Sequence, residues 1–163
     1  YKLTKVLELS GLEVINANIF TSKDNRFAAN TFITKNIHHQ RTFNKADLTE
    51  LENRIEKNFA KFENSKYKRL KPKKLNFEKI VNISHSKNDE KGRNLITIET
   101  SDSHGLLSNI AKVFYKEKAS IFSARINTLG ERVEDTFEIE NVNQTLISNY
   151  KIKKIIKALK EVV

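Results

Sequence analysis

Apolar side chains recur along this chain with two different periods, and each period predicts one kind of element. Apolar residues spaced as one face of a helix occupy four segments, 3–9, 48–62, 106–116 and 152–163. Apolar and polar residues alternate, as in strands with one buried face, in 12–21, 94–100, 119–128 and 133–139. The chain is therefore predicted to be an α+β protein with antiparallel hairpins.

Two parts of the sequence repeat each other. Residues 12–21 match residues 119–128 at a constant offset, so that Ala17 corresponds to Ala124 and Ile19 to Ile126. Each copy has the order helix, strand, turn, strand, helix. This order predicts two ferredoxin-like (βαββαβ) sandwiches, each an antiparallel sheet with helices on one face. We assign the first to 1–64, a basic linker to 65–76, and the second to 77–163.

The two copies are expected to differ at their beginnings. The first strand of the first copy would precede Tyr1, so we expect that copy to be truncated and the chain to be part of a longer protein. The second copy has its first strand at 94–100. Residues 79–84 form another alternating run, and we predict that they are the edge strand beside 94–100, where the fourth strand of such a unit normally lies.

A turn at 102–105 joins a predicted strand to a predicted helix and holds one of only four glycines. The first N–H groups of a helix lack intrahelical partners, and a glycine lets a ligand approach the backbone closely. Donors beside the carboxylate of Asp102 would suit a zwitterion such as an amino acid. The alternative is structural: Asp102 or Ser103 caps the helix, and Gly105 permits close packing.

The second copy resembles the ACT domain, a ferredoxin-like module that commonly binds amino acids. The resemblance rests on Asp-Ser-His-Gly-Leu-Leu at 102–107 and Ala-Arg-Ile-Asn-Thr-Leu-Gly-Glu-Arg-Val-Glu-Asp-Thr-Phe at 124–137. The second run is similar to the C-terminal ACT domain of bifunctional PII uridylyltransferase/uridylyl-removing enzymes. That family usually has Asp-Arg-Pro-Gly where this chain has Asp-Ser-His-Gly. The candidate ligand-binding residues are Asp102, Ser103, His104, Gly105, Leu106, Leu107, Ala124 and Arg125.

The resemblance implies a regulatory role rather than catalysis by this chain. Enzymes of that family attach uridylyl groups to the nitrogen-signalling protein PII and remove them, with Mg²⁺ expected as their cofactor. Their tandem ACT domains sense glutamine. Neither a nucleotidyltransferase loop nor a His/Asp metal motif is visible here, so we expect no catalytic residues, metal or cofactor in this fragment. We expect a cytoplasmic protein that binds glutamine and forms a homodimer through its ACT domains.

Composition changes this picture little. The net charge is +10 and the pI is about 9.7, but the densest basic run, 66–74, is interpreted as a solvated linker rather than a nucleic-acid site. The chain has no cysteine and no apolar stretch long enough for a membrane span. Glu131, Glu134 and Asp135 are interpreted as surface charges of a hairpin, paired with Arg132.

Two alternatives to amino-acid sensing stay open. A pure interaction module would dimerise without responding to amino acids. RNA binding through the sheet lacks the expected aromatic residues on the predicted outer face.

Overall fold

The computed structural model describes residues 1–22, 24, 26–37, 43–64, 81–88, 93–143 and 145–163. The predicted linker at 65–76 lies outside the described residues. Four helices and six strands follow one another as α1 (Lys2–Leu9), β1 (Leu12–Thr21), β2 (Ala28–Asn36), α2 (Lys45–Asn64), β3 (Asn82–Asn88), β4 (Arg93–Ser101), α3 (Leu106–Lys116), β5 (Ala119–Leu129), β6 (Arg132–Asn141) and α4 (Asn149–Lys160). The α+β prediction is confirmed.

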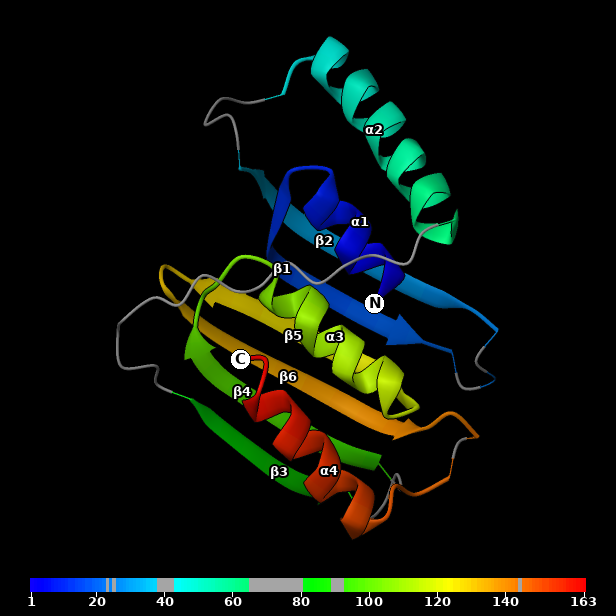
Figure 1. Cartoon of the computed structure of the whole chain (residues 1–163), viewed down its shortest axis with the longest axis vertical. Helices are drawn as coiled ribbons and strands as arrows, with labels where there is room; N and C mark the ends of the chain where they lie inside the picture. The colour runs from blue at the N-terminus through cyan, green and yellow to red at the C-terminus, as the bar shows by residue number, and fades with distance from the viewer. Residues whose placement is uncertain (23, 25, 38–42, 65–80, 89–92, 144) are drawn as a thin grey trace.

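All six strands form one antiparallel sheet in the order β2-β1-β5-β6-β4-β3 (Figure 1). β3 is the edge strand beside β4, as predicted, with Ile83 opposite Ile98. Its position along the chain differs from the prediction: the strand runs from Asn82 to Asn88 rather than over 79–84, and residues 79 and 80 lie outside the described part. The strand extends into polar residues at its C-terminal end. There His85 lies opposite Ile96, and its ring Nε2 is hydrogen-bonded to Oδ1 of Asn94 at 2.8 Å.

The two copies share this sheet because β1 pairs with β5. Ala17 lies opposite Ile126 and Ile19 lies opposite Ala124, so residues that correspond in the repeat exchange partners. Asn18 and its equivalent Arg125 face each other between those pairs. The interface therefore has an internal pseudo-two-fold axis at Asn18, the arrangement that two copies of one unit adopt in an isologous dimer.

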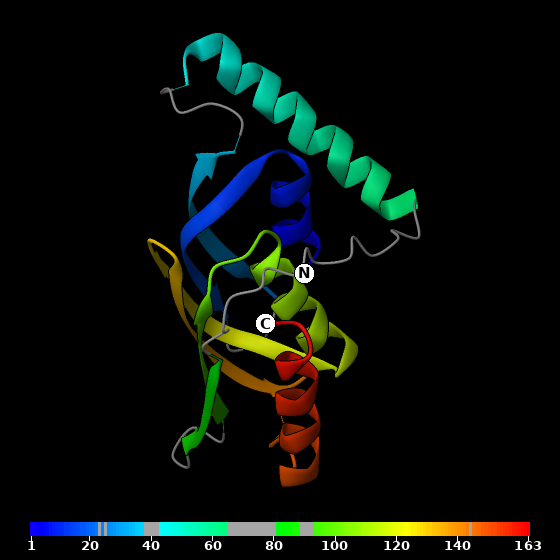
Figure 2. The same ribbon diagram turned by 60° about the vertical axis from the view of Figure 1, so that its left-hand side comes forward.

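Helices α1, α3 and α4 lie on one face of the sheet, and α2 lies across α1 at one end of the molecule (Figure 2). The side-chain amide of Asn58 in α2 donates to the Ser10 hydroxyl at 3.0 Å, and the Phe62 ring packs edge-on against Tyr1. In the described part of the chain, no helix is long and apolar enough to cross a membrane.

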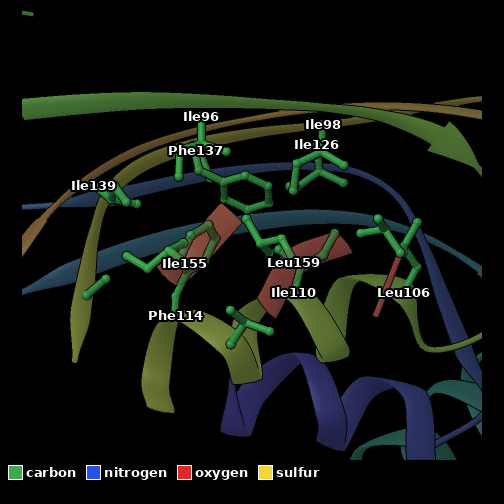
Figure 3. Close-up of a cluster of buried hydrophobic side chains, with 14 of the residues drawn as sticks. Ile96, Ile98, Leu106, Ile110, Phe114, Ile126, Phe137, Ile139, Ile155 and Leu159 are labelled. Carbon is green, nitrogen blue, oxygen red and sulfur yellow. The ribbon is translucent and has the colours of Figure 1, made fainter. Parts of the chain in front are cut away.

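The main core lies between the second copy's helices and the sheet (Figure 3). Phe114 of α3 meets Phe137 of β6 with ring centroids 5.1 Å apart, and both are almost completely buried. Ile155 and Leu159 of α4 are also fully buried, which confirms the apolar face predicted for 152–163. This packing fixes the position of α3, and hence of the turn that precedes it.

Candidate functional site

The turn between β4 and α3 is held by backbone hydrogen bonds. The N–H of Asp102 donates to the carbonyl of Glu131 at 2.7 Å, and the N–H of Leu106 donates to the carbonyl of Ser103 at 3.0 Å. Gly105 is the N-cap of α3 with φ +79°, a left-handed conformation that favours glycine, and no side chain caps the helix. The structural alternative in which Asp102 or Ser103 caps α3 is therefore wrong.

Helix α1 of the first copy places a carboxylate over this turn. The Ser108 hydroxyl donates to Glu8 Oε2 at 2.5 Å, and Lys5 Nζ lies 2.5 Å from Glu8 Oε1. The exposed ring of His104 has its Nε2 3.6 Å from the same Oε1. Glu8 is thus held at the beginning of α3 by groups from both copies of the repeat.

Two further carboxyls, those of Asp102 and Glu13, lie at the same turn. The carboxyl of Asp102 interacts with that of Glu13 at the beginning of β1. Burial is the main cause that raises the pKa of Asp102 above its usual value, and the bond to Glu13 and repulsion from it add to the rise. Lys35, whose Nζ is 3.1 Å from Glu13 Oε2, opposes that rise through its positive charge.

Asp135 of β6 carries a fourth carboxyl close by. Only 1% of the residue is exposed, and its Oδ1 accepts a weak hydrogen bond from the N–H of Asn127 at 3.3 Å. Burial raises the pKa of Asp135 to about 7, the Asn127 bond opposes the rise, and repulsion from Asp102 adds to it. This carboxyl therefore exchanges a proton near neutral pH, which few aspartates do.

These groups line one pocket between the two copies. Its lining comes from α1, the beginning of β1, the turn, the first residues of α3, and the strands β5 and β6. The lining residues are Thr4, Glu8, Leu12–Val14, Asp102–Ser108, Ile126, Thr128, Val133 and Asp135. Backbone and hydroxyl donors, several carboxyls and apolar surface therefore meet in one concave site, as is typical of small-ligand sites.

The structure brings most of the predicted site residues together. All six residues from Asp102 to Leu107 line the pocket. Ala124 and Arg125 do not: Ala124 is buried in the core of the sheet, and Arg125 is exposed on the opposite face, across from Asn18 and Thr136. The alternation of β5 separates these two side chains.

Sequence reasoning missed three carboxylates of the pocket, Glu8, Glu13 and Asp135. The interpretation of Asp135 as a surface charge is wrong, since the residue is buried. Its signal was available in the strand period: Asp135 is in phase with Val133 and Phe137, both of which face the core. Arg132 is paired with Glu99 of β4 instead, at 3.4 Å.

In the part of the chain that the structure describes, no group of three or more His, Cys, Asp and Glu side chains is arranged to hold a metal ion.

Comparison with known proteins relates the chain to one class of enzyme. It is homologous, over more than nine tenths of its length, to the C-terminal region of bifunctional uridylyltransferase/uridylyl-removing enzymes. The enzyme of Psychrobacter sp. (strain PRwf-1) is 30% identical over 152 residues, which are 92% of this chain and 17% of that enzyme. The enzyme of Psychrobacter cryohalolentis is 29% identical over 156 residues, 94% of this chain and 17% of the enzyme.

A shorter match has a higher identity. The enzyme of Cupriavidus metallidurans is 51% identical over 53 residues, 32% of this chain and 6% of that enzyme. The chain thus spans about 17% of the length of the first two relatives and corresponds only to a part of such enzymes. No family model matches it, and no solved structure matches it.

Proposed function

We propose that this chain is an amino-acid-sensing regulatory region, with glutamine as its ligand, of a cytoplasmic uridylyltransferase/uridylyl-removing enzyme. The homology supports the placement within such an enzyme, and the resemblance of 102–107 and 124–137 to ACT domains supports ligand sensing. In this proposal the catalysis, its Mg²⁺ and the contacts with PII belong to other parts of that enzyme. The regulatory region dimerises and reports the concentration of the amino acid.

The observation that carries this proposal is the meeting of Asp102 and the Gly105 turn in a pocket lined by both copies. An amino acid presents an ammonium donor and a carboxylate acceptor a few ångströms apart. The carboxyls of Asp102, Glu13 and Asp135 suit the ammonium group, whereas the first turn of α3 suits the carboxylate.

Thermal unfolding with and without glutamine tests the proposal. Ligand at a hundred times its dissociation constant stabilises a protein by about 2.7 kcal/mol, which corresponds to a rise in Tm of about 5 to 10 °C for a domain of this size. Asp102→Asn keeps the shape of the side chain and removes its charge, so it should abolish the rise. Arg125→Gln is the matched control, since Arg125 lies on the other face of the sheet, and it should keep the full rise.

Two results would refute the proposal. One is a Tm that none of the twenty amino acids raises. The other is a rise that survives in Asp102→Asn but disappears in Arg125→Gln, which would place the ligand on the outer face.

A second candidate function is an association module that binds no amino acid. The pseudo-two-fold pairing of β1 with β5 favours it, because these units already join through their sheets. In the described sheet β2 and β3 are the outermost strands and would be the edges for further pairing. This candidate predicts a dimer whose sedimentation does not change when glutamine is added.

A further inference from the structure

The carboxylate of Glu8 lies where a ligand's carboxylate would bind in the proposed site. Its side chain is only 11% exposed, and it accepts a hydrogen bond from Ser108 in the first turns of α3. A Cβ atom added to Gly105 would lie 3.2 Å from the carboxylate carbon of Glu8 and from both of its oxygens. The glycine therefore allows this carboxylate to approach the beginning of the helix, where the helix dipole favours an anion.

Helix packing alone does not require an acid at this position. The repeat relates Glu8 to Tyr115 and Ser108 to Tyr1, so the contact between Glu8 and Ser108 has an equivalent on the other side of the pseudo-two-fold axis. There the two tyrosine rings stack with centroids 5.8 Å apart. Two aromatic rings thus fill the equivalent place between α1 and α3, whereas the place at Gly105 holds a buried carboxylate.

We propose that Glu8 is an internal competitor of the amino-acid ligand and sets the affinity of the site; this inference rests on the proposed function. The ligand's carboxylate must displace the Glu8 carboxylate from the first turn of α3. The Lys5 ammonium group and the His104 ring, which face Glu8, remain beside whichever carboxylate is bound. Because Glu8 belongs to α1, the first copy of the repeat controls a site whose turn belongs to the second copy.

Calorimetric titration of the 163-residue chain with glutamine tests this role. Glu8→Gln keeps an oxygen that accepts from Ser108 but removes the charge that competes with the ligand. We expect this variant to bind glutamine about fivefold more tightly than the unmodified chain does. This factor corresponds to the typical effect of one anion at a helix N-terminus on the free energy of binding. Glu13→Gln is the control: it removes a charge from the same pocket on the Asp102 side and should give no tighter binding.

Each contrary result overturns the inference. Weaker binding by Glu8→Gln would mean that Glu8 holds the ammonium group of the ligand. Equal tightening by Glu8→Gln and Glu13→Gln would mean that the total charge of the pocket sets the affinity, rather than the position of Glu8.

A measurement without any amino acid separates this inference from the proposed function. Glu8→Ala leaves the place of the carboxylate open, so acetate should raise its Tm in a saturable way, and more than it raises that of the unmodified chain, at constant ionic strength. If acetate acts equally on both proteins, the competitor role is wrong even where glutamine binds. If acetate restores stability to Glu8→Ala alone but glutamine binds neither protein, the proposed function fails and the carboxylate position stands.

Discussion

Replacing Asp135 with asparagine should change how the stability of this protein depends on pH. The pKa of the buried carboxyl is raised from 3.8 to about 7, so the folded protein holds a proton that the unfolded chain has already released. Folding therefore takes up a proton between these two values. The contribution of Asp135 to stability is fully present below about pH 4, falls as the pH rises, and is lost above about pH 7.

The magnitude follows from the size of the shift. About three pKa units at ~1.4 kcal/mol each amount to a cost of about 4 kcal/mol at alkaline pH. Asparagine avoids this cost and keeps an oxygen for the N–H of Asn127, but its amide N–H₂ is buried in place of an oxygen and costs about 2 kcal/mol. The net expectation for Asp135→Asn is a gain of about 2 kcal/mol above neutral pH and a loss in acid.

Urea unfolding followed by circular dichroism gives the test, because the chain has no tryptophan for fluorescence. The free energy of unfolding of the unmodified protein should fall relative to that of Asp135→Asn by roughly 3 kcal/mol between roughly pH 5 and pH 8. Glu134→Gln, at the exposed neighbouring position of β6, is the control and should follow the unmodified protein. Parallel pH profiles for the unmodified protein and Asp135→Asn would show that folding does not raise the pKa of Asp135.

Three backbone positions lead to two further predictions. Gly105→Ala should lower the free energy of unfolding by about 2 kcal/mol and Gly130→Ala by about 1 kcal/mol. Both glycines have positive φ, but only a Cβ at Gly105 would meet the Glu8 carboxylate. Equal losses in chemical denaturation would contradict that contact. Lys118 has φ 51° just after α3, so Lys118→Gly should raise stability by about 0.5 kcal/mol, whereas Lys116→Gly, at the last residue of the helix, should lower it. Equal changes at both lysines would refute the strain at Lys118.

Local patterns predicted the elements of the second copy well. The helix predicted at 106–116 is α3 itself, and the strand predicted at 94–100 extends by one residue at each end. In the sequence repeat Lys118 corresponds to Gly11, which predicts a left-handed backbone conformation at Lys118. Both residues have positive φ. Such features depend on neighbours in the sequence, so periodicity and the repeat are sufficient to find them.

Features that depend on distant contacts were not predictable in this way. The pairing of β1 with β5 joins strands about a hundred residues apart, and the facing residues Asn18 and Arg125 are polar and carry no apolar signal. The contact of Glu8 with Gly105 depends on that pairing, because it requires α1 to lie beside α3. The burial of Asp135 was missed for a different reason, since its charge outweighed its place in the strand period.

A titration with glutamine followed by ¹H–¹⁵N correlation spectra measures the location of the ligand directly. We predict that the largest shifts fall on amides of 102–108 and around Glu8, while Arg125 on the outer face of the sheet stays unchanged. Shifts centred on Arg125, or no shifts at saturating glutamine, would contradict a glutamine site at the turn before α3.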